Sequence, residues 1–178
     1  MGKLLLAAVI FLLLASPALA GHYIGVKWGG NSANQLTVYD STINPSWDQA
    51  LQQAIVFWNQ SPHVNMVYKK VSACPYGARA ICAVEQTPGC WSYANIVSDR
   101  GRIQSPVIIV WGTDGCGGQE QFSTYYNYTA CHEIGHALGL DHRFGEQGTC
   151  MSGGVFVDGV FTNTSPDAHD YAELEIIY

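Results

Sequence analysis

The sequence has few charged residues and no basic run. Charged residues make up 12% of the 178-residue chain, and 8 lysines and arginines stand against 14 aspartates and glutamates, for a formal charge of −6. A surface that binds nucleic acid or an anionic membrane needs clustered positive charge. The excess of acidic residues therefore argues against either partner. Internal repeats and low-complexity segments are missing too. Because hydrophobic residues reach 48%, we expect one compact globular domain.

The sequence also lacks an apolar run long enough to cross a membrane. The longest, Leu4 to Leu14, covers about half of the roughly 20 residues that a spanning helix needs. Lys3 precedes this run and Ala18-Leu19-Ala20 follows it as a small-residue cleavage site, which is typical of a secretory signal peptide. We therefore expect a signal peptide over residues 1–20, secretion, and a mature domain over residues 21–178 that has no membrane contact after cleavage.

No cysteine precedes residue 74, and all six cysteines follow the predicted cleavage point. They are Cys74, Cys82, Cys90, Cys116, Cys131 and Cys150. An even number of cysteines in an exported chain predicts disulfides, because the extracellular environment is oxidising. The number of ways to pair six cysteines leaves the connectivity open at this point.

The spacing of apolar residues predicts an α+β domain. Short apolar or alternating runs predict strands at 36–39, 64–71, 80–84, 91–97 and 105–111. One helix is expected to begin at Ser46, with Gln49 completing a capping box, and to end near residues 61–62. A second helix is expected from about Phe122 to Leu138.

The segment with the most chemical content is HEIGHALGLDH, at residues 132–142. Residues four apart on an α-helix lie on one face about one turn apart, so His132 and His136 are expected to bind one metal ion together. Glu133 points in a neighbouring direction, near enough to act on a metal-bound water without ligating the metal. Glycine ends helices by adopting the left-handed conformation, so Gly139 would turn the chain and make His142 the third ligand.

Three imidazoles leave the fourth position of a tetrahedral zinc ion open, which is typical of a catalytic site and not of a structural one. We therefore expect one catalytic zinc ion held by His132, His136 and His142. His22, His63 and His169 lie outside this segment and are expected to be ordinary surface or core histidines. The glycine-rich segment at 112–118 is the place to look for calcium, but it has no EF-hand spacing, so a plain loop is expected.

With Met151 following His142, these residues resemble the metzincin clan of zinc endopeptidases, whose pattern is H-E-x-x-H-x-x-G-x-x-H and then a methionine-containing turn. Within the clan the segment is most similar to matrixins and small secreted bacterial metzincins, and the turn at Met151 is similar to that of snapalysins. Arg143 differs from the residue that matrixins, astacins or serralysins have after the third histidine.

The resemblance implies an α+β, metzincin-like zincin domain: a twisted mixed β-sheet with two long helices, one of them the active-site helix, then a Met-turn and a C-terminal helix. Met151 would lie beneath the zinc ion without ligating it. Ser165 would cap the C-terminal helix, with Pro166 in its first turn. The stretch at 155–161 would line a specificity pocket.

The resemblance further implies a secreted, monomeric zinc-dependent endopeptidase that hydrolyses peptide bonds through a zinc-activated water, with Glu133 as general base and then acid. A peptide or protein substrate would bind extended along the edge strand at 91–97. Two alternatives stay open: a secreted zinc-binding protein without catalysis, and a zinc hydrolase that acts on non-peptide esters or amides.

Two cysteines flank the residues of this motif. Cys131 directly precedes His132 and Cys150 directly precedes Met151, so we hypothesise a disulfide that ties the active-site helix to the Met-turn. Proximity in the chain suggests the pairs Cys74–Cys82 and Cys90–Cys116 for the other four.

Overall fold

A computed structural model describes residues 22–30, 33–75, 77, 79–86, 89, 91–112, 123–145, 148–152, 156–157 and 160–178. Its elements in chain order are β1 (Ala33–Asp40), α1 (Pro45–Trp58), β2 (Val64–Lys70), β3 (Ala80–Gln86), β4 (Tyr93–Asp99), β5 (Arg102–Gly112), α2 (Ser123–Ala137), β6 (Phe156–Val157), β7 (Val160–Phe161) and α3 (Ala168–Ile177). The α+β class expected from the sequence is confirmed. The segment at 1–20, where a signal peptide is expected, lies outside the described residues.

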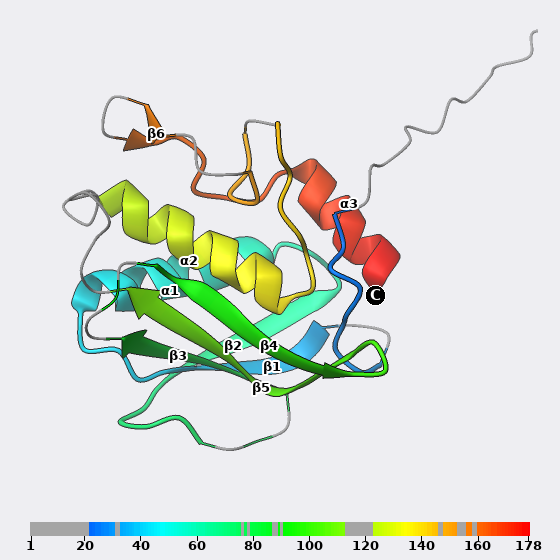
Figure 1. The fold of residues 1–178 in the computed structure, drawn as a ribbon, viewed down its shortest axis with the longest axis horizontal. Coiled ribbons are helices and arrows are strands. Elements are labelled where there is room, and N and C mark those ends of the chain that lie inside the picture. Colours follow the sequence, from blue (N-terminus) through cyan, green and yellow to red (C-terminus); the bar gives the residue numbers. More distant parts are fainter. Residues whose placement is uncertain are drawn as a thin grey trace, which may run out of the picture.

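A mixed sheet of five strands forms one layer of the fold, in the order β2-β1-β3-β5-β4. The pairs β1–β2, β1–β3 and β3–β5 are parallel, whereas β4 runs antiparallel to β5 at the end of the sheet. Helices α1 and α2 lie together on one side of this sheet, and α3 lies near the C-terminal end of α2 (Figure 1). The edge strand β4 thus lies close to the helix that carries the histidine motif.

Two tryptophans join helix α1 to its neighbours, Trp47 to the sheet and Trp58 to α2. Its buried face consists of Trp47, Ala50, Leu51, Ala54, Ile55 and Trp58. Trp47 stacks on Trp111 of β5 with ring centroids 4.6 Å apart, and Trp58 donates a hydrogen bond of 2.9 Å from Nε1 to the carbonyl of Cys131 on α2. Full burial of a large apolar side chain stabilises a fold by about 1.5–3 kcal/mol, so this face anchors α2 firmly.

The predicted caps of α1 and α3 are wrong. Asn44, and not Ser46, caps α1: its side chain accepts from the backbone of the first turn, with Pro45 at the first helical position. Asp167, and not Ser165, caps α3 in a capping box. Asparagine and aspartate cap the N-terminus of a helix as well as serine does. Proline favours the first helical position, so Pro45 indicates that the preceding residue, Asn44, is the cap.

The remaining elements differ from expectation mainly at their ends. The edge strand begins at Tyr93 instead of residue 91, and β5 begins at Arg102 instead of residue 105. The hairpin of β6 and β7 was not predicted, because strands of two residues have no readable period. A disulfide joins Cys74 to Cys82, whereas Cys90 and Cys116 lie outside the described residues. No helix among the described residues is long and apolar enough to span a membrane.

Candidate active site

The three histidines of the motif converge on one point at the end of α2. The Nε2 atom of His132 lies 3.0 Å from Nε2 of His136 and 3.1 Å from Nε2 of His142. Two nitrogen donors at about 2.05 Å from a tetrahedral ion are about 3.3 Å apart, so the three atoms are spaced as ligands of a single zinc ion would be.

Backbone carbonyls fix which ring nitrogen carries the proton. His132 Nδ1 lies 2.7 Å from the carbonyl of Cys150, and His136 Nδ1 lies 2.8 Å from the carbonyl of Leu140. A carbonyl only accepts, so each Nδ1 is protonated and each Nε2 presents its lone pair to the cluster. Burial lowers the pKa of His132 to about 3, with the neighbouring imidazoles acting in the same direction, which keeps its ring neutral. Converging lone pairs suit a metal cation.

Gly139 ends α2 and turns the chain so that the third histidine comes back to the first two. Its φ is +99°, its amide donates to the carbonyl of His136 over 2.9 Å, and the amide of Leu140 donates to that of Gly135 over 3.1 Å. These two bonds make a Schellman motif. A Cβ at residue 139 would lie 2.5 Å from the backbone oxygen of Val26, so both the conformation and the space require glycine.

Met151 forms the floor beneath the histidine-bearing helix. Its side chain is fully buried, and a Cβ on Gly135 would lie 2.2 Å from its sulfur, which shows how closely the helix packs on it. A disulfide between Cys131 and Cys150 links α2 to the same turn. The hydroxyl of Tyr128 adds a hydrogen bond of 2.8 Å to the carbonyl of Ser152. Helix and turn therefore form one rigid unit.

Glu133 is a buried carboxyl with one oxygen left unbonded. The residue is 5% exposed, and Oε2 has no hydrogen-bond partner. Burial raises the pKa of Glu133 to about 8, against a backbone hydrogen bond from Ala94 on β4 that lowers it. A cation held by the adjacent histidines would favour the carboxylate. The side chain thus connects the histidine cluster with the edge strand.

Two charged residues next to the third histidine have roles that the sequence left open or gave no sign of. Asp141 accepts a hydrogen bond of 2.7 Å from the amide of His142, and its Oδ1 lies 3.4 Å from that ring's Nδ1. Arg143 is buried, and its guanidinium donates to both carboxylate oxygens of Asp167 over 2.8 Å. The partner of Arg143 lies at the start of α3, and no local spacing could have indicated it.

A second group of histidines lies outside the motif. His22, His169 and Asp170 each offer one ligand atom, and these atoms all lie within 4.8 Å of one another. The sequence predicted ordinary surface or core histidines at these positions and gave no reason to expect His22 and His169 side by side. The two come from opposite ends of the described chain, so only the folded structure brings them together.

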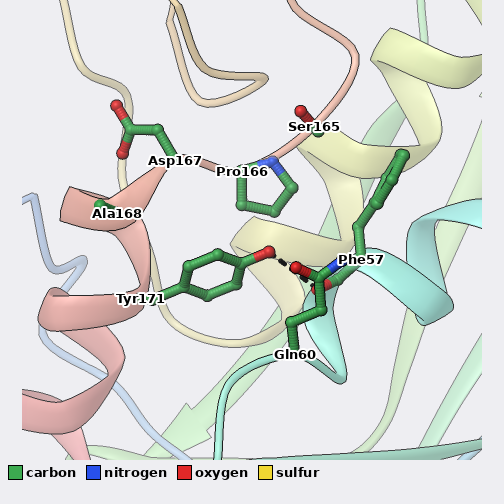
Figure 2. Close-up of a pocket in the computed structure, with 7 residues that line it drawn as sticks. All are labelled: Phe57, Gln60, Ser165, Pro166, Asp167, Ala168 and Tyr171. Atoms are coloured by element: carbon green, nitrogen blue, oxygen red, sulfur yellow. Dashed lines mark hydrogen bonds between the residues drawn. The ribbon is translucent and has the colours of Figure 1, made fainter.

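A surface pocket lies between the end of α1 and the start of α3, and no residue of the histidine motif lines it. Figure 2 shows its lining, which consists of Phe57, Gln60, Ser165, Pro166, Asp167, Ala168 and Tyr171. The hydroxyl of Tyr171 donates to the carbonyl of Phe57 over 2.9 Å across it. Asp167 is the one carboxylate among these lining residues, and it is already paired with Arg143. We assign no chemistry to it.

Comparison with known proteins points to zinc proteases. No family model matches the chain. Zinc metalloproteinase nas-31 of Caenorhabditis elegans is 31% identical over 121 residues, which make up 68% of this chain and 16% of that protein. The chain thus spans about a sixth of the length of that relative.

Solved structures share the fold, and one of them is a zinc-protease by its description. The crystal structure of myroilysin superposes with a TM-score of 0.53 and 15% identity, over 86% of each chain. High choriolytic enzyme 1, a hatching enzyme zinc-protease from Oryzias latipes, superposes with a TM-score of 0.50 and 13% identity, over 86% of this chain and 93% of that one. At such identities these likenesses show the fold.

Proposed function

We propose that this chain, which has the fold and the three-histidine motif of the metzincin clan, is a secreted zinc-dependent endopeptidase. The observation that carries the proposal is the convergence of three histidine Nε2 atoms beside a buried glutamate with an unbonded oxygen. Nε2 of His132 lies 3.0 Å and 3.1 Å from the Nε2 atoms of the other two histidines. Three neutral imidazoles are a ligand set of catalytic zinc sites, because they leave one coordination position open.

His132, His136 and His142 would hold the zinc ion. When bound, zinc would acidify a water molecule and polarise the scissile carbonyl. Glu133 would take the proton from the attacking water and deliver it to the leaving amine. The carbonyls of Cys150 and Leu140 keep the first two rings in the tautomer that binds metal.

The edge strand β4 is the proposed docking place of an extended peptide. It ends the sheet, and its outer side chains include Tyr93 and Val97, which are 46% and 59% exposed. A strand with a free edge can pair with a substrate backbone through main-chain hydrogen bonds. Ala94, in the same strand, bonds to Glu133, so a peptide on this edge would lie beside the proposed base.

Secretion is part of the proposal. We propose that residues 1–20 are a signal peptide and that residues 21–178 form the metallopeptidase domain. The disulfides Cys74–Cys82 and Cys131–Cys150 support an oxidising destination, because such bonds are rare in reducing compartments.

Two other functions fit a zinc site of this kind: zinc binding without catalysis, and hydrolysis of non-peptide esters or amides. Turnover of denatured casein and of a small ester, each with and without a zinc chelator, separates them. We expect chelator-sensitive cleavage of casein. Chelator-sensitive turnover of the ester alone would favour the non-peptide hydrolase, and no turnover of either substrate by zinc-loaded protein would favour the binding protein.

A further inference from the structure

The second histidine group lies where the first described residues of the chain meet α3. The segment that begins at residue 22 runs beside this helix (Figure 1). The ammonium of Lys27 donates to the carbonyl of Ile177 over 2.6 Å, and the amide of Trp28 donates to the hydroxyl of Tyr178 over 3.3 Å. These contacts hold the segment against the helix independently of the histidines.

His22 presents an unbonded ring nitrogen inside this contact. The residue is 5% exposed, and its Nδ1 lies 2.9 Å from the carbonyl of Asp141. Because a carbonyl only accepts, Nδ1 carries the proton of the neutral ring. The lone pair is then on Nε2, which is buried without a hydrogen-bond partner and lies 3.4 Å from Oδ1 of Asp170.

Asp170 and His169 supply two further ligand atoms. Oδ2 of Asp170 accepts hydrogen bonds from the hydroxyl of Thr149 and from the amide of Asp167, which leaves Oδ1 for the side of His22. The ring of His169 stacks on that of His22 with centroids 5.2 Å apart, and its buried Nδ1 also has no hydrogen-bond partner. One nitrogen of each ring and one carboxylate oxygen of Asp170 lie within 4.8 Å of one another.

We propose that His22, His169 and Asp170 form a second metal site that binds Zn²⁺, separate from the site of the histidine motif. Two acceptor atoms that face each other at 3.4 Å repel unless a proton or a metal cation lies between them, and about 3.3 Å is the spacing of two ligand atoms on a tetrahedral zinc ion. Two imidazoles and one carboxylate are a donor set that zinc takes in proteins.

Arg143 lies close to this site without filling it. Its Nη1 donates a long hydrogen bond of 3.5 Å to Oδ1 of Asp170, and its shorter bonds, of 2.8 Å, go to Asp167. A carboxylate oxygen has more than one lone pair, so Oδ1 can accept this bond and still ligate an ion. It would pin the segment at His22 to α3 and, through the carbonyl of Asp141, to the chain just before the third motif histidine.

Zinc stoichiometry tests this site without reference to peptide hydrolysis. Metal-free protein is loaded with ZnCl₂, freed of loose ion by gel filtration, and analysed for bound zinc per chain. We expect two ions in the wild type, one in His22→Asn, one in His169→Gln and one in His136→Gln. The matched control is His63→Gln, which removes a histidine outside both groups and should keep two ions.

The Co²⁺-loaded protein provides a second readout, because His169→Gln should remove part of the visible absorption of wild type while the band of the motif site stays. Near-ultraviolet circular dichroism identifies any variant that fails to fold. If His22→Asn fails to fold, His169→Gln decides the question, because His169 is less buried than His22. One ion in the wild type, lost entirely in His136→Gln, would overturn the proposal, as would two ions in both His22→Asn and His169→Gln.

Discussion

Replacing Gly139 by alanine should destabilise the fold at the point where it assembles the histidines. A non-glycine residue in the left-handed region costs about 1–2 kcal/mol, and φ at this residue is +99°. The added Cβ would also lie 2.5 Å from the oxygen of Val26, which is backbone and cannot rotate away. Overpacking of this kind costs about 1–3 kcal/mol, so we expect a total loss of about 2–5 kcal/mol in the free energy of unfolding.

Gly30 provides a matched control. Its φ is +98°, nearly the same, but a Cβ there would meet nothing within 4 Å. Gly30→Ala should therefore show the conformational cost alone. Urea unfolding followed by tryptophan fluorescence measures both variants, with zinc content determined on each. If Gly139→Ala loses no more stability than Gly30→Ala, the close approach to Val26 is not what fixes this turn, and the reasoning fails.

Three further results are expected. Burial opposes ionisation of Asp167, but hydrogen bonds from Arg143 outweigh it and hold the pKa of Asp167 below its usual range. The stability that this carboxylate contributes is complete above the ordinary carboxyl pKa and is lost as the pH falls through the lowered pKa. Asp167→Asn should therefore reduce the fall of Tm over that acidic range, and an unchanged curve of Tm against pH would contradict this. Removing the Cys131–Cys150 disulfide, whose sequence separation is 19, by a double change to alanine should cost about 3 kcal/mol in urea unfolding and weaken zinc retention, whereas equal stability would show that the bond does not constrain the chain. A chelator should lower Tm, because zinc binds the folded chain, and excess zinc should restore it; an unchanged Tm would argue against a bound ion.

The elements with a strong local pattern were predictable from the sequence. The buried face of α1 repeats at helical spacing, and the apolar block of β5 is long enough to mark a covered strand. The ends were less predictable, because several residues near each end can cap a helix. Asn44 and Ser46 both qualify as α1 caps, and only the folded backbone decides which side chain faces the free amides.

The sites differ in the same way. His132, His136 and His142 lie within one helix and its turn, so a local rule of helix geometry was enough to bring them together. His22 and Asp170 meet because the first described segment packs along α3, and Arg143 meets Asp167 because the chain after α2 contacts the start of α3. Contacts of such long range depend on the whole fold, and a single sequence carries no local sign of them.

The most direct test of the central claim compares wild type with Glu133→Gln, each loaded with zinc and assayed for hydrolysis of denatured casein. The variant keeps the size of the side chain and removes the proton acceptor, so we expect activity to fall by about 10²–10⁴-fold while the three histidines still hold their ion. Glu173→Gln, which changes another buried glutamate, is the control and should stay active. Full activity of Glu133→Gln with its zinc in place would contradict the account.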